Sequence, residues 1–66
     1  MNMMREVGKL QEDYQNLIDK NKLTKKSLCE LCTPFRDKYN LTDIQVLRIV
    51  RKEMSLLEMM DLLNFQ

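Results

Sequence analysis

The sequence predicts an all-α protein, a compact bundle of four to five short helices in one domain over residues 1–66. Only one glycine and one proline occur among the 66 residues, and small strand-rich domains usually need more turn residues than that. Apolar residues recur at helical spacing, and side chains that cap helix N-termini precede several of these runs. A domain of this size buries only about 60% of the surface of its unfolded chain, so its core is small.

The first helix is expected over residues 3–20. Its apolar residues are three or four positions apart or adjacent, and together they form one stripe: Val7, Leu10, Tyr14, Leu17 and Ile18. Gly8 lies inside this run and costs about 1 kcal/mol relative to alanine, so the helix is expected to fray before it. Asn21-Lys22 is the turn that follows.

The second helix is expected to begin after Thr24, whose hydroxyl can accept a hydrogen bond from an amide of the first turn. It is expected to end near Cys32, because Pro34 lacks an amide proton and disfavours a helical conformation in the residue before it. A separate short helix is predicted over residues 34–39, with Asn40 as its end.

Two capping boxes mark helix starts in the last third of the chain. The pairs are Thr42 with Gln45 and Ser55 with Glu58. They predict helices over residues 43–53 and 56–64. One helix of about 22 residues is the alternative, because neither glycine nor proline lies between Asp43 and Asn64.

The charges are unevenly distributed, although the net charge is only +1. Residues 21–52 carry eight basic and three acidic side chains, whereas residues 1–20 and 53–66 are acidic overall. A basic middle is a candidate surface for phosphates. The alternative is that these charges are solvated helix faces.

Catalytic chemistry is not evident. The chain has no histidine for general base catalysis near neutral pH. Its only glycine is Gly8, so no glycine-rich loop can hold phosphates. We therefore expect no enzyme, no cofactor and no small-molecule substrate. No apolar run is long enough for a membrane span and no signal peptide is evident, so a cytoplasmic protein is expected.

Cys29 and Cys32 form an isolated C-x-x-C pair. Structural zinc needs four ligands, and the chain has neither histidine nor a second cysteine pair. Both thiols are expected to be small apolar residues of the core, and no metal site is predicted. A redox dithiol and a metal shared between two copies are the alternatives.

Three segments of the chain are similar in residue order to a known DNA-binding family. They are residues 23–32 (LTKKSLCELC), 42–51 (TDIQVLRIVR) and 54–63 (MSLLEMMDLL). They resemble the second, recognition and closing helices of the phage-repressor-like (Xre or lambda-repressor-like) helix-turn-helix family. The chain departs from the family in about seven extra residues at 33–39, and in Lys52, where the family usually has glycine.

This resemblance implies a small transcriptional regulator that binds duplex DNA as a homodimer. Gln45 and Arg48 would read base edges, and most of the other residues would hold phosphates. The implied DNA-binding set is Lys25, Lys26, Thr42, Asp43, Ile44, Gln45, Arg48, Arg51 and Lys52.

A second surface is predicted at the C-terminal end, where seven of the ten residues 54–63 are leucine or methionine. Methionine is common at adaptable binding surfaces. The candidate protein interface is Met54, Leu56, Leu57, Met59, Met60 and Leu63. The alternative is that these side chains complete the core. The interface supports a second hypothesis, a helical adaptor, anti-regulator or chaperone that binds another protein and not DNA, and exposed Ile44 and Leu47 would fit it too.

Overall fold

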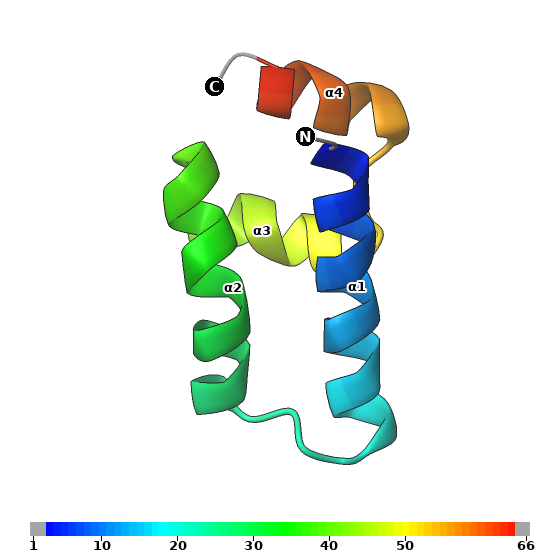
Figure 1. Ribbon diagram of the computed structural model, residues 1–66, viewed down its shortest axis with the longest axis vertical. Coiled ribbons are helices and arrows are strands. Elements are labelled where there is room, and N and C mark those ends of the chain that lie inside the picture. The colour runs from blue at the N-terminus through cyan, green and yellow to red at the C-terminus, as the bar shows by residue number, and fades with distance from the viewer. Residues whose placement is uncertain (1–2, 65–66) are drawn as a thin grey trace.

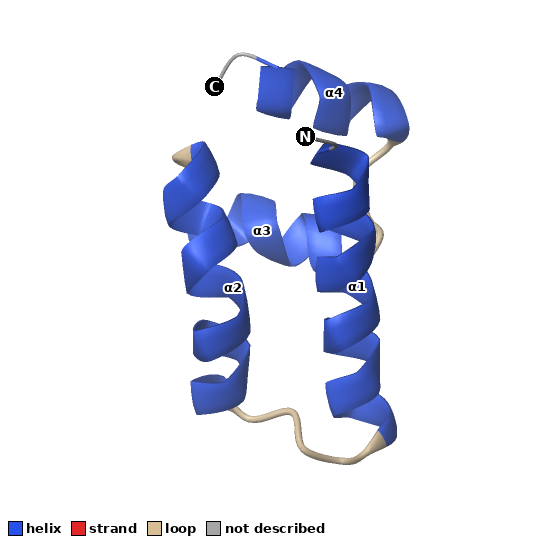
Figure 2. Cartoon of the chain, in the orientation of Figure 1, coloured by secondary structure: helices blue, strands red, loops and turns tan. Residues whose placement is uncertain are grey.

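The structure, a computed structural model, describes residues 3–64. It contains four helices, α1 (Met3–Asp19), α2 (Lys25–Tyr39), α3 (Asp43–Val50) and α4 (Leu56–Asn64), shown in Figure 1. No strand occurs in this part of the chain, as Figure 2 shows, and the all-α prediction is confirmed. None of these helices is both long enough and apolar enough to cross a membrane.

The first two helices are antiparallel neighbours, and α3 crosses both of them on one side (Figure 1). The last helix lies over the end of the molecule where α1 begins and α2 ends (Figure 1). The centre of the core is formed by α1 and α3, whose side chains Val7, Val46 and Ile49 are fully buried. The other buried apolar residues are Leu10, Phe35, Tyr39, Leu41, Val50, Met54, Met59 and Leu63.

The predicted break at Cys32 is wrong, because α2 continues through Pro34 to Tyr39. Proline removes the amide that would bond to the carbonyl of Glu30, but Glu30 is exposed, so water can reach that carbonyl. Phe35 and Tyr39 lie one turn apart and are both buried, with ring centroids 4.8 Å apart. Burial of these two rings favours a continuous helix over a break.

The first turns of α1 are also better ordered than the sequence predicts, because the helix extends N-terminal of Gly8 to Met3. Glu6 accounts for this difference. Its carboxylate accepts hydrogen bonds from Lys38 Nζ and from the Tyr39 hydroxyl, each at 2.6 Å. These bonds join the start of α1 to the end of α2.

The predicted starts of α2, α3 and α4 are confirmed, whereas the one predicted at Pro34 is wrong because α2 runs through it. Thr24 and Thr42 cap α2 and α3, each in a reciprocal capping box. At the start of α4, the Glu58 amide donates to Ser55 Oγ, and the Ser55 amide donates to Glu58 Oε1. The chain from Asp43 to Asn64 is therefore two helices, as predicted, although α3 ends three residues earlier than expected, at Val50.

Three helices end with the same backbone conformation. Asn21, Asn40 and Lys52 adopt left-handed conformations, with φ of 54°, 54° and 59°. In each case the next amide donates to a carbonyl five residues earlier, which is the Schellman closure. These bonds are Lys22 to Leu17 at 2.8 Å, Leu41 to Arg36 at 2.9 Å and Glu53 to Arg48 at 2.8 Å.

Candidate nucleic-acid interface

The residues that the resemblance assigns to DNA lie on the first turn of α2, on α3 and in the turn after α3. Gln45 and Arg48 are partly buried, and the other seven are exposed. The inner face of α3 packs into the core, so its opposite face is turned to solvent. The candidate interface is therefore one face of α3, flanked by basic side chains at the start of α2 and at the end of α3.

The connection between α2 and α3 has the length of a helix-turn-helix turn. It consists of three residues, Asn40, Leu41 and Thr42, and Leu41 is buried. The extra residues 33–39 do not separate the two helices by a loop, because they form the last two turns of α2. They lengthen α2 and leave a tight connection to α3.

The two expected base-reading side chains already have partners within the chain. Gln45 Oε1 accepts a hydrogen bond from the Thr42 amide at 2.9 Å. Arg48 Nη2 donates to the Glu53 carbonyl and to Glu58 Oε2, both at 3.3 Å. Gln45 thus caps α3, and Arg48 joins α3 to α4. These contacts are all exposed, where hydrogen bonds and ion pairs contribute little.

An acidic residue also lies on this face. Asp43 Oδ1 accepts a hydrogen bond from Arg36 Nη1 at 2.7 Å, which joins the start of α3 to α2. The pKa of Arg36 is raised by its hydrogen bonds to Asp43 and Asp37. Arg36 therefore offsets the charge with which Asp43 would repel a phosphate.

Both cysteines line a groove of about 230 Å³ between α2 and α3. The expectation that both are core residues is correct for Cys32, which packs against the core, and wrong for Cys29, which is exposed. Burial raises the pKa of the Cys32 thiol, and nearby Cys29 and Asp43 add to this effect. A raised pKa leaves less thiolate at neutral pH, which lowers the nucleophilicity of Cys32. Within residues 3–64, no group of three or more cysteine, aspartate or glutamate side chains is arranged to hold a metal ion.

The structure divides the C-terminal interface set into two groups. Met54, Met59 and Leu63 are buried, and so they complete the core. The exposed apolar side chains of α4 are Leu56, Leu57 and Met60, which are 54%, 73% and 42% exposed. The interface that α4 can form is therefore narrower than the one expected from the sequence.

A larger groove, which the sequence does not predict, lies between α1 and α2 and has a volume of about 460 Å³. Its lining combines apolar residues (Leu10, Leu31, Pro34 and Phe35) with charged ones (Arg5, Glu6, Lys9, Asp13 and Lys38). Each wall is an ordinary amphipathic helix face, and the two walls are at least 18 positions apart in the sequence. Only the pairing of the two helices produces the groove, so no local pattern predicts it.

The described residues thus present three candidate binding surfaces: a basic helix face, an exposed apolar helix face and an apolar groove with a charged rim. Comparison with known proteins assigns none of them, since no protein-family model, no curated protein and no solved structure matches this chain.

Proposed function

We propose that this protein is a small transcriptional regulator that binds duplex DNA through α2 and α3. The observation that supports the proposal is the three-residue turn between these helices. Because Val46, Ile49 and Val50 anchor the inner face of α3, its outer face is free to enter a major groove. Arg48 and Arg51 lie on or beside that outer face.

The basic residues at both ends of the face would supply most of the affinity. Lys25, Lys26, Arg51 and Lys52 are exposed, and contact with phosphates would release counterions from the duplex. Arg48 and Gln45 would exchange their intrachain partners for base edges. For Arg48 this exchange costs little, because exposed ion pairs are worth only about 0–1 kcal/mol. For Gln45 it costs the capping bond to Thr42, and a helix cap is worth about 0.5–2 kcal/mol.

Fluorescence anisotropy with a labelled random-sequence duplex tests the proposal. Affinity should fall steeply between about 50 mM and about 200 mM salt, with a slope of about −0.9 for each phosphate contacted. Replacing Arg48 and Arg51 by glutamate should abolish binding.

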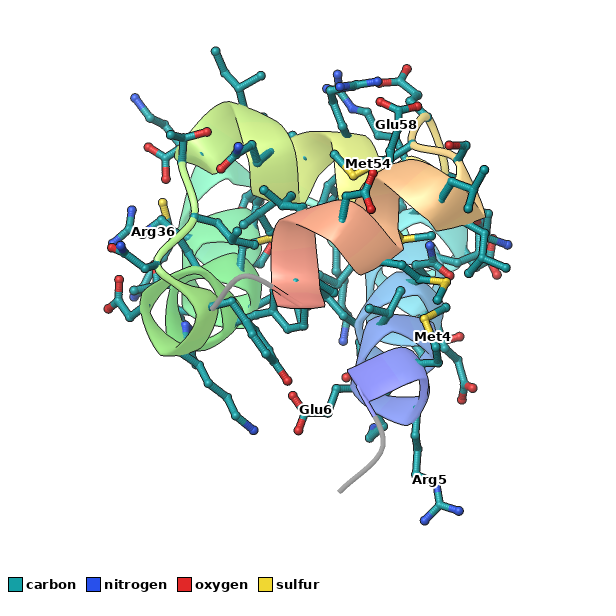
Figure 3. The ribbon with its side chains drawn as sticks, turned by 90° about the horizontal axis from the view of Figure 1, so that it is seen from above. Met4, Arg5, Glu6, Arg36, Met54 and Glu58 are labelled. Carbon is teal, nitrogen blue, oxygen red and sulfur yellow. The ribbon has the colours of Figure 1, made fainter. Side chains whose placement is uncertain are left out.

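The control for this variant changes the net charge equally but on the opposite side of the molecule. Arg5 lies on the side away from α3 (Figure 3), and Lys9 is one turn further along α1. Replacing Arg5 and Lys9 by glutamate should leave most of the affinity, because these residues lie outside the proposed interface. An absence of wild-type binding at low salt, or an equal loss in both variants, would contradict the proposal.

The second candidate function is protein binding through α4, including formation of a homodimer. It is favoured by the high exposure of Leu57, Leu56 and Met60 in so small a domain. At 100° per residue these three side chains fall within an arc of about 100° on the helix. Such an apolar arc is typical of an interface.

Sedimentation equilibrium tests the homodimer. Replacing Leu57 and Met60 by glutamine should weaken self-association. The matched control replaces Ile44 and Ile18 by glutamine, because these residues are 70% and 42% exposed and lie on other helices. Equal effects of the two double variants would show that association is unspecific.

A further inference from the structure

We propose that α4 of one copy docks into the groove between α1 and α2 of a second copy. This inference rests on the second candidate function, that α4 is a surface for self-association, and is independent of DNA binding. In this arrangement α4 of one copy contacts the groove of the other copy, and the two α4 helices do not contact each other.

The floor of the groove is suited to a helix. Leu10 and Phe35 are buried at its base, and Leu31 and the exposed Pro34 form its α2 side. The walls are two antiparallel helices, and the groove is about 460 Å³ in volume. An apolar groove between helices accepts an amphipathic helix that inserts anchors at spacings of three and four residues, as Leu57 with Met60 and Leu56 with Met60 provide.

The rim of the groove has more cations than acids. Its basic residues are Arg5, Lys9 and Lys38, and its acidic residues are Glu6 and Asp13. Lys38 is bonded to Glu6 at 2.6 Å, and Lys9 lies 3.2 Å from Asp13. The side chain of Lys9 nevertheless remains 72% exposed, so it can also contact a charge on a partner.

The outer face of α4 is complementary to this groove. Leu56, Leu57 and Met60 supply the apolar side chains, and Asp61 follows Leu57 by one helical turn. Residues 53–66 carry three acidic and no basic side chains. The apolar arc matches the apolar lining of the groove, and Asp61 is the α4 carboxylate beside the arc that can meet a cation of the rim.

A second copy is required for this contact. Met59 and Leu63 bury one face of α4 in its own domain, and the arc of Leu56, Leu57 and Met60 lies beside that face but stays exposed. The contact joins two different surfaces, so it is heterologous. It gives a closed dimer only if each copy inserts its α4 into the groove of the other.

Two variants that each disable one side of the contact provide the test. In the groove variant, Pro34→Glu places a charge on the α2 side of the groove without removing a buried side chain, and Pro34→Ala is its control. In the helix variant, Leu57→Gln is combined with Met60→Gln. Each variant alone should self-associate at least about tenfold more weakly than the wild type, because an interface anchor is lost. The Pro34→Ala control should associate like the wild type.

Mixing the two variants gives the decisive measurement. The groove variant keeps an intact α4 and the helix variant keeps an intact groove, so an equimolar mixture should form a 1:1 complex by sedimentation. If Pro34→Glu self-associates like the wild type, the groove is not the partner surface, whereas α4 can still pair with α4. If the mixture recovers no association, or if the wild type stays monomeric, the proposed docking is wrong. A monomeric wild type also contradicts the α4 homodimer, whereas normal self-association of Pro34→Glu contradicts only the docking into the groove. The failure of the docking and the failure of the homodimer can therefore be distinguished.

Discussion

Arg48 of α3 and Glu58 of α4 form an ion pair, with Nη2 and Oε2 3.3 Å apart. Figure 3 shows Glu58 on the side of α4 that faces α3. Glu58 is also the third residue of α4 and completes its capping box with Ser55. The pKa of Glu58 is lowered, first by its hydrogen bonds with Ser55 and then by Arg48. One carboxylate thus caps α4 and holds the arginine that is proposed to read DNA.

The first prediction separates these two roles of Glu58. Glutamine retains the capping bonds but has no charge, so Glu58→Gln should release Arg48 and leave the fold intact. Duplex affinity should rise, by roughly fivefold at most, because a surface ion pair is lost and a repulsive charge is removed. Anisotropy measures the affinity, and circular dichroism checks the helix content. A lower affinity in Glu58→Gln would show that Glu58 positions Arg48 for DNA and does not compete with it.

The second prediction concerns Lys52, which has φ of 59°. A left-handed conformation costs a residue with a β-carbon roughly 1–2 kcal/mol, and glycine avoids this cost. Lys52→Gly should therefore raise the free energy of unfolding by about 1 kcal/mol, and the Tm by about 4–8 °C. Asn40→Gly is the control, since Asn40 has nearly the same φ but asparagine tolerates it. An equal gain at both positions would contradict the explanation. If Lys52 contacts a phosphate, the salt slope of DNA binding should also fall by about one.

The third prediction concerns Pro34 inside α2. Proline is about 3 kcal/mol worse than alanine in a helix interior, while it also restricts the unfolded chain. Pro34→Ala should therefore stabilise the protein by about 2 kcal/mol in urea unfolding. A loss of stability would show instead that a bend at Pro34 is needed to bury Phe35 and Tyr39.

The fourth prediction concerns acid stability. Hydrogen bonds from Lys38 and Tyr39 lower the pKa of Glu6 below its ordinary value of 4.5. The carboxyl group of Glu6 therefore binds a proton more tightly in the unfolded chain than in the folded protein. The stabilisation that Glu6 provides is complete above pH 4.5 and is lost as the pH falls through the lower pKa of the folded protein. Measured as Tm against pH, the acid-induced decrease should be smaller in Glu6→Gln than in the wild type. Glu12→Gln, at an exposed glutamate of the same helix, should follow the wild-type curve.

The capping residues next to each helix are sufficient to predict where α2, α3 and α4 begin. Thr24, Thr42 and Ser55 were identified as caps because a hydroxyl three positions before a free amide satisfies it within one turn. The apolar stripes on α1 and α3 were also recognisable, since helical periodicity fixes which side chains share a face. These signals also placed Ile44 and Arg48 of the proposed DNA-binding set on the outer face of α3.

Helix ends and surfaces depended on contacts between distant residues. Pro34 predicts a break from its own chemistry, but the burial of Phe35 and Tyr39 favours a continuous helix. Lys52 gives no local sign of a helix end, and its left-handed conformation is visible only in the fold.

The sequence by itself determined that the protein is helical, where its helices begin and which of their faces are apolar, because these properties arise within one or two turns. The tertiary structure alone decided which apolar residues are buried. In α4 it buries Met59 and Leu63 and leaves Leu57 exposed, although all three are equally apolar in the sequence. It also created the groove between α1 and α2, because a groove needs two helices that only folding brings together.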